Sequence, residues 1–153
     1  MTAINSLNLD SALSRAGPAA ESFARLWKSL WQQTYIKPEE LELCRLTFAR
    51  LHADEDEIAA PNAAVPVLDA TRRQAVLAGK ALESAAFTPG EKAILLFAEY
   101  YWLDPQSITD EAADDVKKHY GEPGLVFLIE SLGVIDGRIR TARVLRDLKT
   151  AKS

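Results

Sequence analysis

Apolar residues recur at the spacing of an α-helix through most of this chain, and that pattern limits the possible folds more than any other feature. Runs that alternate apolar and polar residues are too short to predict a strand. The clearest helical stretch lies between residues 19 and 34, where one broad apolar face is formed by Phe23, Leu26, Trp27, Leu30 and Trp31. We therefore expect an all-α protein.

Capping residues and prolines predict where several helices begin. Pro38 suits a first helical position, and Asp69 suits an N-cap. Thr88-Pro89-Gly90-Glu91 combines a threonine cap, a proline and a glutamate at capping-box spacing. Together with the apolar spacing, these signals predict a bundle of six to seven helices, at about 19–34, 38–51, 70–84, 89–103, 110–119, 125–135 and 138–149.

Other residues predict breaks between these helices. The acidic run Asp54-Glu55-Asp56-Glu57, followed by Pro61-Asn62, predicts fraying and a loop. Gly121 is expected to end a helix, and Gly133 and Gly137 predict either a further break or a close packing contact.

The length of 153 residues corresponds to one domain. We expect residues 1–17 to form a flexible N-terminal arm, with Gly17-Pro18 at its end. Residues 18–153 are expected to form a single helical domain.

Charge and composition exclude several classes of protein. The net charge of −4 argues against a nucleic-acid binder, which needs a positive surface. The longest apolar run, Ala93 to Leu103, is interrupted by Glu99 and is shorter than the roughly 20 residues that cross a bilayer. Met1–Ser6 lacks the features of a signal peptide, and the lone Cys44 allows no internal disulfide. We expect a cytoplasmic protein that binds neither nucleic acid nor membrane.

Two stretches resemble the alkylhydroperoxidase D-like and carboxymuconolactone decarboxylase superfamily. Residues 41–51 are similar to the family's helix that opens with Glu-Leu and leads into the active site. Residues 87–99 are similar to its threonine- or serine-capped helix that ends in an apolar-Ala-Glu pattern. The similarity extends from about Pro18 to Leu148 and implies the family's helical bundle.

The residues of the family's peroxidase chemistry are missing. In the peroxidase branch, a glutamate is followed after twelve residues by Cys-x-x-Cys and then by a histidine. Counted from Glu42, these positions hold Asp54, Glu57 and Pro61. A carboxylate neither attacks a peroxide nor resolves a sulfenic acid, so peroxidase activity is the least expected function. The decarboxylase branch also uses that histidine, and Pro61 transfers no proton.

Glu42, Arg45 and His52 are the candidate catalytic residues. They lie within about 80° of one another on a helical wheel. In the functional interpretation, Arg45 holds a substrate carboxylate while Glu42 or His52 moves a proton. In the structural interpretation, Glu42 and Arg45 form a salt bridge that locks this helix to its neighbour.

Two functions from different classes remain open. The first is binding or conversion of a small organic acid or lactone in a pocket between helices, which requires Glu42 and Arg45 to converge on that pocket. The second is a non-catalytic role in assembly or partner binding, which requires a filled core and an apolar external patch. No metal or cofactor is expected, and a homo-oligomer is expected. A dimer is preferred, with a trimer or hexamer as alternatives.

Overall fold

The computed structural model describes residues 3–151 of the chain, with side chains to Leu148. It contains seven α-helices, three short 3-10 helices and no strand within that range, which confirms the predicted all-α bundle of six to seven helices. Residues 1–2 and 152–153, at the ends of the predicted arm and domain, lie outside the described residues. The helices are α1 (Leu9–Ala12), α2 (Pro18–Leu30), α3 (Pro38–Leu51), α4 (Glu55–Ala59), α5 (Ala70–Leu77), α6 (Pro89–Leu103) and α7 (Asp110–Ala151), and the 3-10 helices are η1 (Ser14–Ala16), η2 (Ala81–Glu83) and η3 (Pro105–Ser107).

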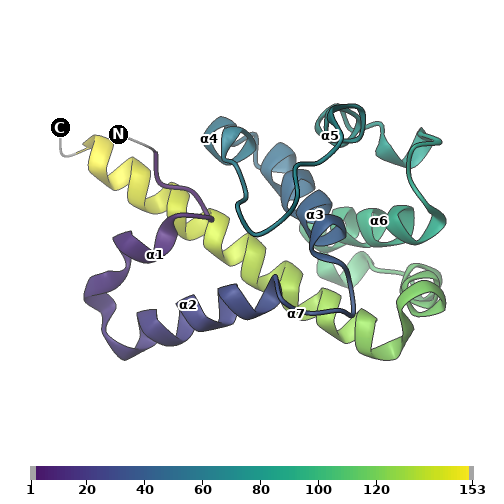
Figure 1. Ribbon diagram of the computed structural model, residues 1–153, viewed down its shortest axis with the longest axis horizontal. Coiled ribbons are helices and arrows are strands. Elements are labelled where there is room, and N and C mark those ends of the chain that lie inside the picture. Colours follow the sequence, from purple (N-terminus) through teal and green to yellow (C-terminus); the bar gives the residue numbers. More distant parts are fainter. Residues whose placement is uncertain (1–2, 152–153) are drawn as a thin grey trace.

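The long helix α7 organises the molecule. The part of α7 after Gly121 crosses the structure, with α1 and α2 on one side and α3 to α6 on the other (Figure 1). The last part of α7 therefore lies beside α1, near the beginning of the chain.

The predicted capping signals are confirmed. Proline occupies the first turn of α2, α3 and α6, where its missing N–H costs no hydrogen bond. At the start of α6, the Glu91 amide donates to Thr88 Oγ1 over 3.1 Å, and the Thr88 amide donates back to the Glu91 carboxylate. These are the two bonds of a capping box.

Several predicted boundaries differ from the structure. The helix predicted at 19–34 ends at Leu30, and the helix predicted at 70–84 ends at Leu77, before the separate η2. The acidic run is not a loop, because the Asp54 carboxylate accepts a hydrogen bond from the Glu57 amide and starts the short helix α4. At Gly133 and Gly137 the predicted alternative of a break does not occur, because α7 continues there. The alternative of close packing is met at Gly133, where an added Cβ would lie 3.2 Å from the Tyr101 hydroxyl. The break predicted at Gly121 is confirmed, since its φ of 73° is left-handed backbone that favours glycine.

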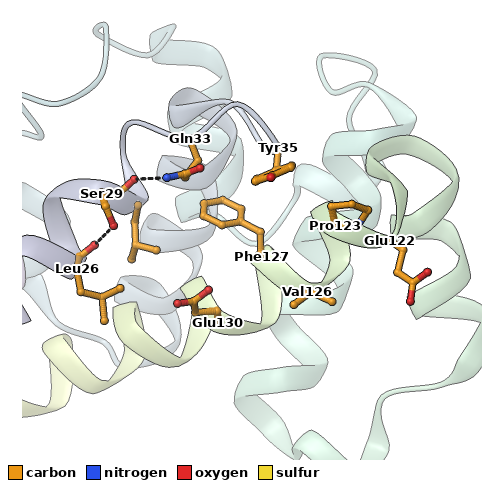
Figure 2. A pocket seen from close by; sticks show the side chains of 10 residues that line it. Leu26, Ser29, Gln33, Tyr35, Glu122, Pro123, Val126, Phe127 and Glu130 are labelled. Carbon is orange, nitrogen blue, oxygen red and sulfur yellow. Dashed lines mark hydrogen bonds between the residues drawn. The ribbon is translucent and has the colours of Figure 1, made fainter.

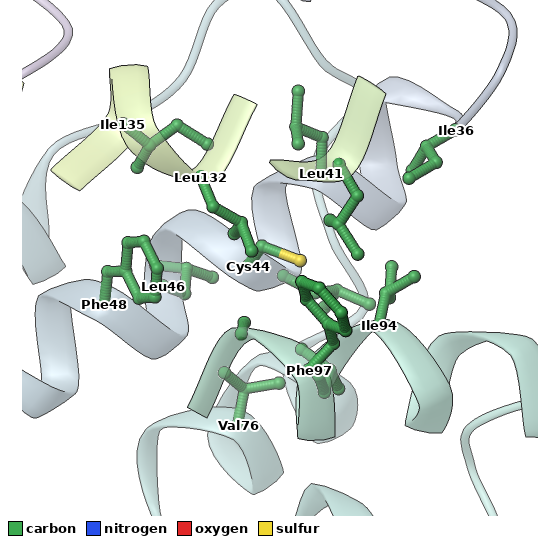
Figure 3. Packing of buried hydrophobic residues seen from close by; sticks show 14 of the residues in the cluster. Ile36, Leu41, Cys44, Leu46, Phe48, Val76, Ile94, Phe97, Leu132 and Ile135 are labelled. Atoms are coloured by element: carbon green, nitrogen blue, oxygen red, sulfur yellow. The ribbon is translucent and has the colours of Figure 1, made fainter. Parts of the chain in front are cut away.

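The core lies between α3, α6 and α7 (Figure 3). Cys44 is fully buried there, and its sulfur points between Leu132 and Phe97. Burial raises the pKa of the Cys44 thiol well above its usual range. This thiol is therefore a small apolar core residue rather than a nucleophile.

The segment before Pro18, predicted as a flexible arm, is attached to α7. Leu9 and Ser6 are fully buried. The guanidinium of Arg138, also fully buried, donates to the Ser6 carbonyl over 2.7 Å and 2.9 Å and to Asp10 over 2.9 Å. It also stacks over the Trp27 ring at 4.3 Å. Burial of Leu9 and the bonds from Arg138 together hold this segment. The bonds from Arg138 join residues more than 120 positions apart, so the local sequence pattern does not reveal them.

Candidate functional site

Arg45 is the centre of a buried polar network. It lies in the middle of α3 and is 1% exposed. Its Nε donates to Glu42 Oε1 over 2.8 Å, and its Nη1 donates to the side chain and carbonyl oxygens of Glu57 over 2.8 Å and 3.0 Å. Its Nη2 donates to Glu42 and, over 3.4 Å, to the Ala60 carbonyl. The structure thus brings two of the three candidate residues together, with Glu57 as an unpredicted third member.

This network leaves the Arg45 guanidinium no free donor. A guanidinium has five N–H groups, and the bonds to Glu42, Glu57 and Ala60 occupy all of them. Burial by itself lowers the pKa of Arg45, but the two carboxylates reverse this effect and raise it above the usual value. Arg45 is therefore a permanent cation that is already neutralised by the protein.

The Glu42 carboxylate is also occupied. It is 3% exposed, and besides Arg45 it accepts a hydrogen bond from the side-chain amide of Asn62. Asn62 belongs to the loop after α4, so Glu42 attaches that loop to α3.

The two positions that the family gives to cysteines hold structural carboxylates. Glu57 is fully buried and accepts from the Ser6 amide over 2.7 Å and from the Ser6 hydroxyl. Asp54 caps α4 and pairs with Arg146 of α7 over 2.6 Å. Burial raises the pKa of Asp54, but the bond from Arg146 and the Glu57 amide outweigh it, so the pKa is lowered. Pro61, at the histidine position, is exposed.

His52 belongs to a different cluster. It is the C-cap of α3, and its Nε2 lies 2.7 Å from Asp136 Oδ1 of α7. Its Nδ1 lies 3.1 Å from Nη1 of Arg143. Because arginine only donates, Nδ1 is the acceptor and Nε2 carries the proton donated to Asp136. The bonds of His52 go to α7 and not to Glu42 or Arg45, so the predicted trio is not one site.

Asp136 also bonds to Arg140 over 2.8 Å. Burial raises its pKa, but the bonds from His52 and Arg140 together lower it. Asp136 is therefore an ionised carboxylate in the middle of α7 that binds His52 at the end of α3.

A small pocket of about 270 Å³ is lined by both Glu42 and Arg45, as the small-acid hypothesis requires. Its wall includes Asn62, Leu68 and Arg73. The Nη2 of Arg73 donates a hydrogen bond to the Ile58 carbonyl. The other two guanidinium nitrogens of Arg73 have no hydrogen-bond partner among the described residues. This pocket is where a small acid would meet an available cation.

Sequence reasoning missed a polar cleft of about 350 Å³ between α3 and the first part of α7. Glu40 and Tyr120 both lie in its wall. Burial raises the pKa of Glu40, with the nearby Glu91 adding to the effect, and burial also raises the pKa of Tyr120. No spacing rule links residues so far apart in the chain.

Sequence reasoning also missed a groove of about 560 Å³ between α2 and α7. Figure 2 shows Leu26 of α2 and Val126 and Phe127 of α7 on its walls, with Tyr35 above and Glu130 at the rim. Val126 is 58% exposed and Tyr35 51% exposed. Apolar side chains of α2 and α7 line this groove together with Ser29, Gln33, Glu122 and Glu130, and none of its lining residues belongs to the Arg45 network.

Glu99 belongs to none of these clusters. Glu99, noted for its place in an apolar run, is partly exposed and pairs with Arg50 over 2.8 Å. Within residues 3–151, no group of acidic, histidine or cysteine side chains could hold a metal ion. None of the helices in the described range combines the length and apolar content that a membrane crossing requires.

Comparisons with protein families, with curated proteins and with solved structures find no match.

Proposed function

We propose that this protein is a divergent, alkylhydroperoxidase D-like helical protein without catalytic chemistry, which acts by presenting a helical face to a protein partner. The observation that carries the proposal is the full use of the Arg45 guanidinium by Glu42, Glu57 and Ala60. Arg45 lies on the helix that resembles the family's active-site helix. Because its guanidinium has no free donor, Arg45 is suited to stabilising the fold rather than to binding a substrate.

The energetics support the same conclusion. For Arg45 to bind a substrate carboxylate, its pairing with Glu42 or Glu57 must break inside the protein. Leaving one member of a buried ion pair uncompensated costs about 3–5 kcal/mol. The interaction of Arg45 with a substrate carboxylate would have to offset this free-energy cost before binding became favourable.

The two features required for a partner-binding protein are both present. The core is filled, with Cys44 and Phe97 fully buried or nearly so. The α2–α7 groove supplies an external apolar surface, with Val126 and Tyr35 more than half exposed. Apolar grooves between helices are suited to receiving another helix.

A thermal-shift screen against small aromatic acids, lactones and hydroperoxides tests this proposal, with Glu42→Gln run beside the wild type. We expect the substitution to lower the melting temperature and no compound to raise the wild-type value. A compound that stabilises the wild type but not the Glu42→Gln protein would establish a ligand site and refute the proposal.

One observation favours a second candidate, the binding of a small organic acid. The pocket beside Glu42 contains Arg73, whose guanidinium retains two nitrogens without a partner in the described part of the chain. In this alternative, Arg73 rather than Arg45 holds the carboxylate. A small acid whose thermal shift is lost in Arg73→Gln and kept in the exposed control Arg15→Gln would support it.

A further inference from the structure

One face of α7 is exposed along most of its length. On a helical wheel its residues fall within about 100° of arc. The face begins in the α2–α7 groove and ends near the C-terminus, and it comprises Glu122, Val126, Ile129, Glu130, Gly133, Gly137, Arg140, Val144, Asp147 and Leu148. Its apolar members Val126, Ile129, Val144 and Leu148 are 44% to 58% exposed. From residue 122 to residue 148, the face is about 39 Å long.

The centre of this face contains a glycine that the isolated chain does not explain. At Gly133, an added Cβ would lie 3.2 Å from the Tyr101 hydroxyl, so that glycine makes room for Tyr101. At Gly137, an added Cβ would meet no atom within 4 Å. Glycine inside a helix costs about 1 kcal/mol relative to alanine. A close approach by another backbone would account for Gly137.

The first half of this face is acidic, and the second half carries one charge of each sign. The half before Gly133 carries Glu122 and Glu130, and the half after Gly137 carries Arg140. Asp147 is also in the second half. An antiparallel pairing of two such faces places Glu130 against Arg140 near the centre, although it also brings Asp147 near Glu122 at each end. A parallel pairing places Glu130 against Glu130 and Arg140 against Arg140, so the antiparallel pairing is the more favourable of the two.

We propose that the partner is a second copy of this chain, docked through an antiparallel, two-fold contact between the two α7 faces. This inference rests on the proposed function and names the partner. With the two-fold axis level with Ile135, Glu130 of one copy lies opposite Arg140 of the second copy. On the same axis, Gly133 lies opposite Gly137 and Val126 lies opposite Val144.

The groove fits this arrangement. Val126 lies on the groove wall, so Val144 of the second copy enters the groove beside Leu26 and Phe127. Arg140 already bonds to Asp136 through Nε, and its side chain is 60% exposed. Its terminal nitrogens can therefore reach Glu130 of the second copy. Because the contact is isologous, each pairing occurs twice.

Charge reversal at the two ends of this ion pair tests the proposal. Sedimentation velocity over a range of protein concentrations would compare the wild type with Glu130→Arg, Arg140→Glu and the double variant. We expect a wild-type dimer, about tenfold or greater weakening in each single variant, and recovery in the double variant. Lys117→Glu, an exposed charge reversal outside the face, is the matched control and should leave the dimer unchanged.

Both substitutions are at exposed positions, and circular dichroism with thermal melting verifies that each variant folds. A wild type that stays monomeric at every concentration would overturn the inference, as would a Glu130→Arg protein that dimerises as tightly as the wild type. A monomer would leave the proposed function standing with another partner. The proposed function itself fails on a different result, namely a small ligand whose binding depends on Glu42.

Discussion

Replacing Arg45 with methionine should destabilise the protein severely. Methionine retains much of the apolar stem but removes the cation that pairs with both buried carboxylates, Glu42 and Glu57. Removing one partner of a buried ion pair costs about 3–5 kcal/mol. Domains are stable by only about 5–15 kcal/mol in total. At about 2–4 °C per kcal/mol for a chain of this size, the melting temperature should fall by roughly 6–20 °C.

Urea denaturation followed by circular dichroism at neutral pH measures this loss. A triple variant, Arg45→Met with Glu42→Gln and Glu57→Gln, should recover at least half of it, because no unpaired charge remains buried. Arg15→Met is the exposed control and should change the free energy of unfolding by less than about 0.5 kcal/mol. If Arg45→Met lay within about 1 kcal/mol of the wild type, the network would not be structural and this reasoning would be wrong.

Three further predictions concern other contacts of α7. Arg138→Met should cost about 2–4 kcal/mol, because it removes charge-assisted bonds to the Ser6 carbonyl, and hydrogen exchange of residues 5–9 should accelerate. Because the pKa of Asp54 is lowered by Arg146, its contribution to stability is complete above about pH 4 and is lost as the pH falls through the folded value. Asp54→Asn should therefore flatten the acid limb of a stability–pH curve, and an unchanged limb would contradict the assignment. Gly137→Ala should raise the melting temperature of dilute protein by about 2–4 °C, since the added Cβ meets open space and alanine favours the helix.

The parts of the fold that follow local rules could be predicted from the sequence. The start of α6 is an example, because a capping box involves residues only three apart. The helix α4 was missed because its acidic residues suggest solvation, and only the long-range bonds of Glu57 to Ser6 and Arg45 account for its burial. Continuity of α7 was missed because glycine is a weak helix former, and tertiary packing overrides that propensity at Gly133.

In the candidate site, too, contacts between residues close in sequence could be predicted, and contacts between distant residues could not. Glu42 and Arg45 are three residues apart on one helix, so their ion pair followed from spacing. Helical spacing grouped His52 with them, but position along the helix placed it at the C-cap, where it meets Asp136. The partnership of Glu40 with Tyr120 depends on the tertiary fold and left no local signal.

Cysteine cross-linking across α7 tests the central claim most directly. Val126 and Val144 of one chain are about 27 Å apart along the helix, too far for a disulfide within that chain. The native Cys44 is fully buried and supplies no competing thiol. Under mild oxidation, the Val126→Cys/Val144→Cys protein should become a covalent dimer, and neither single variant should cross-link. Single variants that cross-link as readily as the double variant, or a double variant that stays monomeric, would contradict the two-fold α7 contact.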